Sequence, residues 1–405
     1  MAIIILMVVG LCCSNTFCQT AYIPNYGDNA VYVINVQTNS VTDTIPVGNT
    51  PIGVSVSPDG TRVYIANNGD TTVSVINTST NKVTATITVG RNPWGIAVSP
   101  DGMKVYVAND SSNSVSVINT STNLVTATIP VGNLPIGLAI TPDGSKLYVL
   151  NDSDNTVSVI NTATNMVMHV IPVGLGPFGV FASPDGMNVY VANQYGNSVS
   201  VINTGTNTVT ATIPVGAGPY GLATTPDGSK LYVTNNGDNA DSITVINTAT
   251  RGVTATVIVG PNPYNANVTP DGTKVYVTNE FGHSVSVISV ATNLLLDSII
   301  VGNNPSALGN FFSSSASAGI ASQKMSQGNI SIYPNPFTSQ TTISFSQEQK
   351  NSTLLIRDVS GKLLKTYDFS GNEFIINRGE MSPGVYFLSI EDEMKNVVNR
   401  KLIVE

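Results

Sequence analysis

Residues able to act as acids, bases or nucleophiles are few in this 405-residue chain. The two histidines are His169, in the segment VMHVIPV, and His283, in the segment NEFGHS. All three cysteines lie within the first twenty residues, so the body of the chain has no thiol for disulfides, metal binding or nucleophilic attack. No His-x-x-x-His or nucleophile-elbow pattern is present. The sequence therefore predicts no catalytic residue and no cofactor.

Acidic side chains in a set of similar loops are the remaining candidates for polar chemistry. Asp110 lies in the loop NDSSNS, Asp152 and Asp154 lie in NDSDNT, and His283 lies in NEFGHS. Carboxylates from separate loops can pair for general acid and base catalysis, and Asp and Asn oxygens can hold calcium. The spacing matches no closed calcium loop, and these residue types are favoured in turns, so no metal site is predicted.

Internal repeats show which elements must position these loops. The tetrapeptide SPDG or TPDG recurs every 42 residues four times running and then after 44. Tyr-x-x-Asn and Val-Gly follow the same period, each occurring seven times. The tetrapeptide begins at Ser57, Ser99, Thr141, Ser183, Thr225 and Thr269.

Each repeat has the pattern of four short strands. IGVSVS, TRVYIAN, TVSVIN and KVTATITV are rich in β-branched residues and are separated by turn sequences. A sheet of about 40 residues cannot cover both of its faces alone, so neighbouring sheets must stack, and radial stacking gives a propeller. We therefore predict an all-β fold, a seven-bladed β-propeller over 21–312 whose two ends complete one shared blade.

One position just after each Val-Gly is unusually rich in aromatic residues. This position lies at the start of the innermost strand of each repeat. We therefore expect its side chains at the rim of the central channel, where exposed rings often contact sugars or peptides. The alternative is that they close the channel mouth by packing on one another. Around the ring the position holds Ile52, Trp94, Ile136, Phe178, Tyr220, Tyr264 and Ser306.

The repeats resemble a known family. YIAN, YVAN, YVLN and YVTN, followed by VSVINTxTN and VTATIPVG, are similar to the YVTN-repeat β-propellers. The resemblance spans 21–312 and implies the propeller fold. Many members of that family are surface-exposed proteins of uncertain ligand, so the resemblance implies a fold more than a function.

The remaining chain has a different pattern. Residues 313–328 are poor in bulky apolar side chains and predict a linker. Residues 329–405 contain about seven alternating segments, which predict a small Ig-like β-sandwich. SIYPNPF, RDVSGKLL, SPGVYFLSI and the terminal KLIVE resemble a type IX secretion sorting domain of type A. The resemblance implies contact with the secretion machinery, and a protein that is released or held on the cell surface.

The N-terminus and the charge limit the location and the partners. An uncharged apolar run of about twelve residues predicts a signal peptide at 1–18.

The formal net charge is -8, and 21–312 contain 16 acidic against 8 basic residues. An acidic domain with no basic stripe repels phosphate backbones, so no nucleic-acid partner is expected.

These observations favour a non-enzymatic binding scaffold. The loops that follow Tyr-x-x-Asn, such as NDSSNS, NDSDNT and NEFGHS, vary from repeat to repeat. We expect these variable loops to recognise a glycan, a peptide or a neighbouring surface protein. Two alternatives stay open: a propeller hydrolase or lactonase with a cation in the channel mouth, and a structural subunit of a surface layer.

Overall fold

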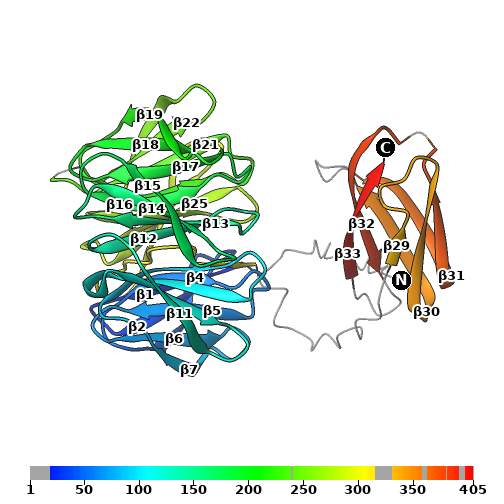
Figure 1. The fold of residues 1–405 in the computed structure, drawn as a ribbon, viewed down its shortest axis with the longest axis horizontal. Coiled ribbons are helices and arrows are strands. Elements are labelled where there is room, and N and C mark those ends of the chain that lie inside the picture. The colour runs from blue at the N-terminus through cyan, green and yellow to red at the C-terminus, as the bar shows by residue number, and fades with distance from the viewer. Residues whose placement is uncertain are drawn as a thin grey trace, which may run out of the picture. The chain divides into compact units, whose positions relative to one another are not determined.

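The computed structural model describes residues 19–238, 240–314, 331–357, 363–379, 381–391 and 397–404. The expected signal peptide at 1–18 and most of the expected linker lie outside the described residues. The chain divides into two compact units, one up to Ser317 and one from Ala318, which are described separately (Figure 1). In the described ranges, no helix has the length and apolarity needed to cross a membrane.

The first unit consists of seven four-stranded antiparallel sheets, which confirms the predicted seven-bladed propeller. Six blades use consecutive strands, numbered outward from the channel. Blade 1 has β4 (Pro51–Val56), β5 (Arg62–Asn67), β6 (Thr72–Asn77) and β7 (Lys82–Thr88); blade 2 has β8 (Pro93–Val98), β9 (Lys104–Asn109), β10 (Ser114–Asn119) and β11 (Leu124–Pro130), with the short 3-10 helix η1 (Asp110–Ser112); blade 3 has β12 (Pro135–Ile140), β13 (Lys146–Asn151), β14 (Thr156–Asn161) and β15 (Met166–Pro172).

The next three blades repeat the same plan. Blade 4 has β16 (Pro177–Ala182), β17 (Asn188–Asn193), β18 (Ser198–Asn203) and β19 (Thr208–Pro214); blade 5 has β20 (Pro219–Thr224), β21 (Lys230–Asn235), β22 (Ser242–Asn247) and β23 (Gly252–Ile258); blade 6 has β24 (Pro263–Val268), β25 (Lys274–Asn279), β26 (Ser284–Ser289) and β27 (Leu295–Ile300).

Blade 7 joins the two ends of the repeat region, as the sequence predicted. Its order is β28 (Phe312–Ser314), β1 (Gln19–Asn25), β2 (Ala30–Asn35) and β3 (Ser40–Pro46). β28 pairs antiparallel with β1, with Gln19 opposite Ser314 and Ala21 opposite Phe312. The strand runs two residues past the expected end of the propeller at 312.

The SPDG and TPDG tetrapeptides form the tight turns between the first and second strands. In the turn of blade 2 the Ser99 hydroxyl donates to Asp101 Oδ1 at 2.5 Å, and the N–H of Gly102 donates to the Ser99 carbonyl. The hydrogen bond from Ser99 holds the pKa of Asp101 below its usual value. Gly102 has φ +72°, a conformation that glycine adopts without strain. These aspartates therefore form turns.

Other repeated residues tie each blade to the next. The Tyr148 hydroxyl in blade 3 donates to Asn207 Oδ1 in the outer turn of blade 4 at 3.1 Å, and Tyr276 makes the equivalent bond from blade 6 to Asn39 of blade 7. Lys104 Nζ donates to a carbonyl of blade 3, that of Thr162, at 2.7 Å. The Tyr-x-x-Asn and NTxTN motifs thus serve the contact between blades.

The inner strands approach one another too closely for side chains at their third position. A Cβ on Gly53 would lie 2.0 Å from the Trp94 carbonyl oxygen, and one on Gly179 would lie 1.9 Å from that of Tyr220. Glycine therefore occupies this position in five blades, at Gly53, Gly95, Gly137, Gly179 and Gly221.

The inner segment of blade 7 departs from this plan, which the sequence did not predict. Residues 305–310 form no regular strand, and Leu308 pairs in parallel with Gly53 of blade 1. Asn265, which replaces the glycine in blade 6, donates from Nδ2 to the Ala307 carbonyl at 2.7 Å. Asn267 donates to the Gly309 carbonyl. Two asparagines thus bind backbone that has left the sheet.

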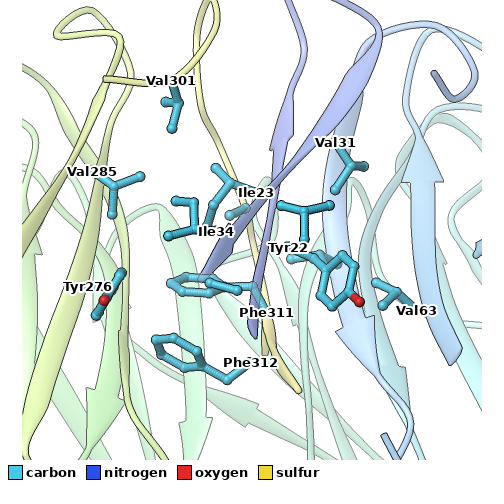
Figure 2. Packing of buried hydrophobic residues seen from close by; sticks show 14 of the residues in the cluster. Tyr22, Ile23, Val31, Ile34, Val63, Tyr276, Val285, Val301, Phe311 and Phe312 are labelled. Carbon is cyan, nitrogen blue, oxygen red and sulfur yellow. The ribbon is translucent and has the colours of Figure 1, made fainter. Parts of the chain in front are cut away.

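A large apolar core surrounds the closing blade. Phe311 and Phe312 lie between Tyr276 of blade 6 and Tyr22 of β1, and their ring centroids are 4.9 Å apart (Figure 2). Phe312 also contacts Tyr276 edge to face at 5.2 Å. Val63 of blade 1 belongs to the same core, so the core bridges three blades.

The second unit is a five-stranded antiparallel sheet with its own buried core. Its order is β29-β30-β32-β33, and β31 pairs with β30. Polar residues near 347–351 and 370–372 suggested strand breaks, but the chain continues through register shifts, with positive φ at Asn351 and Gly371. Two long strands therefore replace four expected short ones. The strands are β29 (Ser331–Tyr333), β30 (Gln340–Arg357), β31 (Leu363–Asn377), β32 (Gly384–Glu391) and β33 (Val397–Val404).

The core of the closing blade gives the first prediction. Phe311→Ala should lower the free energy of unfolding of the propeller by about 3–5 kcal/mol, because the fully buried ring joins the two chain ends. Chemical denaturation followed by tryptophan fluorescence measures the change. Phe281→Ala, at a ring that is 61% exposed, is the matched control and should change stability little. Equal losses in the two variants would contradict the role of Phe311 in closure.

Candidate functional site

Six of the seven side chains at the position after Val-Gly pack together with Tyr26 and Leu308 at one mouth of the channel. We call this group the channel cluster. Its rings contact directly: Phe178 stacks on Tyr220 at 3.9 Å between centroids, and Trp94 meets Phe178 edge to face at 5.8 Å. Tyr264 contacts both Phe178 and Tyr220. Ile52, Ile136, Phe178, Tyr264 and Leu308 are its buried members, and Tyr26, Trp94 and Tyr220 are partly buried.

Burial separates two kinds of ring within the channel cluster. Phe178 and Tyr264 are only 6% and 5% exposed, so they close the channel by packing. Trp94 and Tyr220 keep part of their surface in solvent. Burial raises the pKa of Tyr220 to about 12, with the Glu280 charge as the next cause. The buried rings of the channel cluster therefore close the channel. Its partly exposed rings, Trp94 and Tyr220, form an outer surface that we call the aromatic floor.

The seventh position of the channel cluster is held by a residue that the sequence repeat did not indicate. Ser306 is the counterpart of Trp94 by spacing, but it is fully buried, and its N–H donates to the Pro24 carbonyl. Leu308, two residues later, packs in the channel cluster instead. The displaced inner segment of blade 7 causes this shift. Nothing in the 42-residue period could have revealed it.

A ring of seven side chains surrounds this aromatic floor on the face that carries the variable loops, the variable face. Each follows the buried Asn of a Tyr-x-x-Asn motif, and its N–H donates to the carbonyl just before an inner strand, as from Asp110 to Asn92 and from Asp152 to Leu134. We call these residues the polar ring. Its members are Tyr26, Asn68, Asp110, Asp152, Gln194, Asn236 and Glu280.

Three carboxylates lie in the polar ring, which contains no Lys, Arg or His. Burial raises the pKa of Asp110, and the charge of Asp152 in the next blade raises it further. Burial likewise raises the pKa values of Asp152 and Glu280. The Tyr26 hydroxyl donates to Glu280 at 2.7 Å. The structure therefore brings Asp110 near Asp152, and Glu280 is a site residue that the sequence analysis missed.

The other two predicted loop residues have structural partners. Asp154 Oδ2 accepts the backbone N–H of Asn133 at 2.7 Å, and its Oδ1 accepts Asn133 Nδ2 at 2.8 Å. The backbone hydrogen bond is the main cause that lowers the pKa of Asp154. His283 Nδ1 accepts the N–H of Asn304 at 3.2 Å. In blade 3 the Asn155 side chain accepts the equivalent N–H, that of Gly176 just before blade 4, at 2.8 Å, so His283 takes the place of an asparagine.

Over the described ranges, no three His, Cys, Asp or Glu side chains lie close enough together to hold a metal ion. His169 lies on the outer strand β15, opposite Val159, and is therefore remote from the inner strands.

Comparison with known proteins identifies both units. A profile of YNCE-like β-propellers matches residues 137–239, and a profile of seven-bladed lactonase propellers matches 19–128 and 83–170. A profile of secretion-system C-terminal sorting domains matches 331–405. The chain is a β-propeller protein with a C-terminal sorting domain. The sorting domain marks it as a substrate of type IX secretion, either secreted or attached to the cell surface.

Solved structures support the fold of this propeller protein. Hydrazine synthase of Kuenenia stuttgartiensis is 26% identical, with a TM-score of 0.62 over 67% of this chain and 92% of the other. A protein of unknown function from Desulfotomaculum acetoxidans is 17% identical, with a TM-score of 0.63 over 71% and 97%. A 6-phosphogluconolactonase candidate from Bacteroides uniformis is 19% identical, with a TM-score of 0.62 over 72% and 99%. Among curated proteins, none matches the chain.

His283 gives the second prediction. His283→Asn should leave the free energy of unfolding within about 0.5 kcal/mol of the original, because asparagine accepts the same N–H and tolerates the local φ of +47°. His283→Ala should lower it by about 1 kcal/mol, since the Asn304 N–H loses its acceptor. Urea denaturation compares the two variants. If both lose the same stability, the ring nitrogen does not act as the turn acceptor.

Proposed function

We propose that this propeller protein is an extracellular binding scaffold whose variable face recognises a glycan. The observation that carries the proposal is the partly exposed aromatic floor of Trp94 and Tyr220 inside the polar ring. Aromatic faces cover the apolar face of a sugar ring, and neighbouring amides and carboxylates accept and donate hydrogen bonds to its hydroxyls. A peptide or a neighbouring surface protein would be the alternative ligand of the same face.

The contacts of the polar ring support a prearranged site. Gln194 Nε2 lies 3.4 Å from the Tyr220 hydroxyl, and Asn236 Nδ2 donates to the Pro263 carbonyl at 3.2 Å. Tyr26 is held by Glu280. Groups that are held before binding lose less conformational entropy when a ligand arrives. Exposed rings lie on the same face, including Tyr195, which is 70% exposed and packs beside Gly176.

Substitution of the floor gives the third prediction. Trp94→Ala and Tyr220→Ala together should weaken capture of an oligosaccharide on a glycan array at least tenfold, because hot-spot aromatics contribute about 2 kcal/mol or more. Melting temperature should fall moderately, because both rings are partly exposed but each contacts Phe178. Capture is therefore compared at a temperature at which all variants are folded. Phe178 and Tyr264 are unsuitable here because they are buried in the channel cluster.

Tyr333→Ala is the matched control, because that ring is 80% exposed and lies in the sorting domain. It should leave glycan capture unchanged. Capture that survives the double substitution would reject the glycan site. If the protein binds peptides and no glycan, the ligand of the variable face is a peptide instead.

A hydrolase acting on a lactone is the second candidate. Asp110, Asp152 and Glu280 share the polar ring with raised pKa values, and the lactonase profile covers 19–170. One of these carboxylates could act as a general base toward water. Three negative charges disfavour a phosphorylated substrate, so a neutral lactone is the appropriate probe.

The hydrolase candidate yields the fourth prediction. A general base must be ionised, so hydrolysis of gluconolactone should fall as the pH drops through a pKa above the ordinary Asp and Glu range. Asp152→Asn and Glu280→Gln should each lower kcat by at least a hundredfold if that residue is the base. Asp154→Asn is the control, because its carboxylate is engaged by Asn133. Absence of hydrolysis above the buffer rate would eliminate this candidate.

A further inference from the structure

A cavity of about 540 Å³ occupies the channel on the far side of the channel cluster. Its walls are the inner strands of all seven blades, and it reaches the exposed prolines of the SPDG and TPDG turns at Pro58, Pro184, Pro226 and Pro270. Its inner end is Leu308, which belongs to the channel cluster. The cavity therefore belongs to the face opposite the polar ring, and the site proposed above does not include it.

The residue chemistry of the cavity wall excludes charged ligands. Among its described lining residues there is no Asp, Glu, Lys, Arg or His. A charged group that entered the cavity would lose water and gain no counter-charge, which is costly. The volume lies within the range of sites for small organic ligands, about 300–1,000 Å³. The cavity thus fits a neutral molecule of that size.

The wall has an apolar side and a polar side. Blades 2, 3 and 4 contribute only apolar side chains and glycine backbone beyond the turn prolines, with Ala97, Ile140 and Phe181 as examples. Side-chain hydroxyls and amides come from the contiguous blades 5, 6, 7 and 1. They are Ser55, Ser57, Thr224, Thr225, Asn265, Asn267 and Asn310.

One polar group on that side has no partner within the described chain. Thr224 is 5% exposed, and its Oγ1 makes no hydrogen bond with any described residue. A buried hydroxyl without a partner is unfavourable, because it has lost its hydrogen bonds to water and gained none in the protein. Thr224 lines the cavity, so a ligand hydroxyl that pairs with Oγ1 after rotation of the side chain would remove part of that cost.

We propose that this cavity binds a neutral amphiphile, a molecule with an apolar body and an uncharged, hydroxyl-bearing head. The apolar body would lie against blades 2 to 4, and the head would lie against the hydroxyls and amides of blades 5 to 7 and blade 1. The two faces of the propeller then hold two independent sites. This inference does not depend on the glycan site of the variable face.

Isothermal titration of the intact secreted protein with octyl glucoside below its micellar concentration tests the proposal. We expect saturable binding with a stoichiometry of one. Octyl sulfate, which has the same chain and a charged head, should bind at least tenfold more weakly, and glucose alone should not bind. Equal binding of octyl glucoside and octyl sulfate, or no saturable binding of octyl glucoside, would overturn the proposal.

Two variants locate the binding to the cavity. Ala97→Trp fills the lumen and should abolish octyl glucoside binding, whereas Ala163→Trp places the same ring in an exposed outer turn and should not. Thr224→Val keeps the side-chain shape and removes the hydroxyl. It should raise the Kd about three- to tenfold, the range expected for one hydrogen bond, without lowering the melting temperature.

The variants also separate this site from the one on the variable face. Binding that survives Ala97→Trp, or that is lost in the Trp94 and Tyr220 double variant, would place the octyl glucoside elsewhere and reject the cavity site. If Ala97→Trp loses binding and also has a lowered melting temperature, its loss of binding could come from misfolding. Thr224→Val then decides, because it removes no packing volume: an unchanged Kd would reject the cavity site.

Discussion

The structure depends on the burial of sheet faces between neighbouring blades. Each blade has apolar side chains on both faces, and a single four-stranded sheet cannot cover them. The repeated residues therefore make contacts between blades. Tyrosines such as Tyr148 donate a hydrogen bond to the outer turn of the following blade, and lysines such as Lys104 donate one to a backbone carbonyl of the following blade. Positions that these contacts leave free can vary, and they include those of the channel cluster and the polar ring.

Local patterns explain how much of this fold the sequence could predict. Turn residues and β-branched runs determine the four strands within one blade. Because that pattern recurs with a period of about 42 residues, the sequence was enough to predict seven sheets and the shared closing blade. The path of residues 305–310 was not predictable, because it depends on Asn265 and Asn267, whose side chains bind backbone 42 residues further along the chain. The long strands β30 and β31 were missed for a similar reason: pairing between them carries each strand through polar residues that alone suggest a break.

The candidate site shows the same division between local and long-range information. Spacing placed Trp94, Phe178, Tyr220 and Tyr264 at one end of the channel, and the structure brings them into contact. Spacing could not indicate which rings stay partly exposed, because exposure depends on how the rings stack across blades. It also could not separate Asp152 from Asp154, although they are two residues apart: one lies in the polar ring, and the other binds a loop backbone.

The point at which the ring is closed also determines the asymmetry of the channel. Blade 7 combines the two chain ends, so its inner segment lacks the regular strand that the other blades supply. Asn267 occupies a position that holds Ala or Ser in four of the other blades, and it binds that segment through the Gly309 carbonyl. The same asparagine, with Asn310, forms part of the polar side of the cavity. Ring closure therefore contributes Asn265, Asn267 and Asn310 to the polar side of the channel.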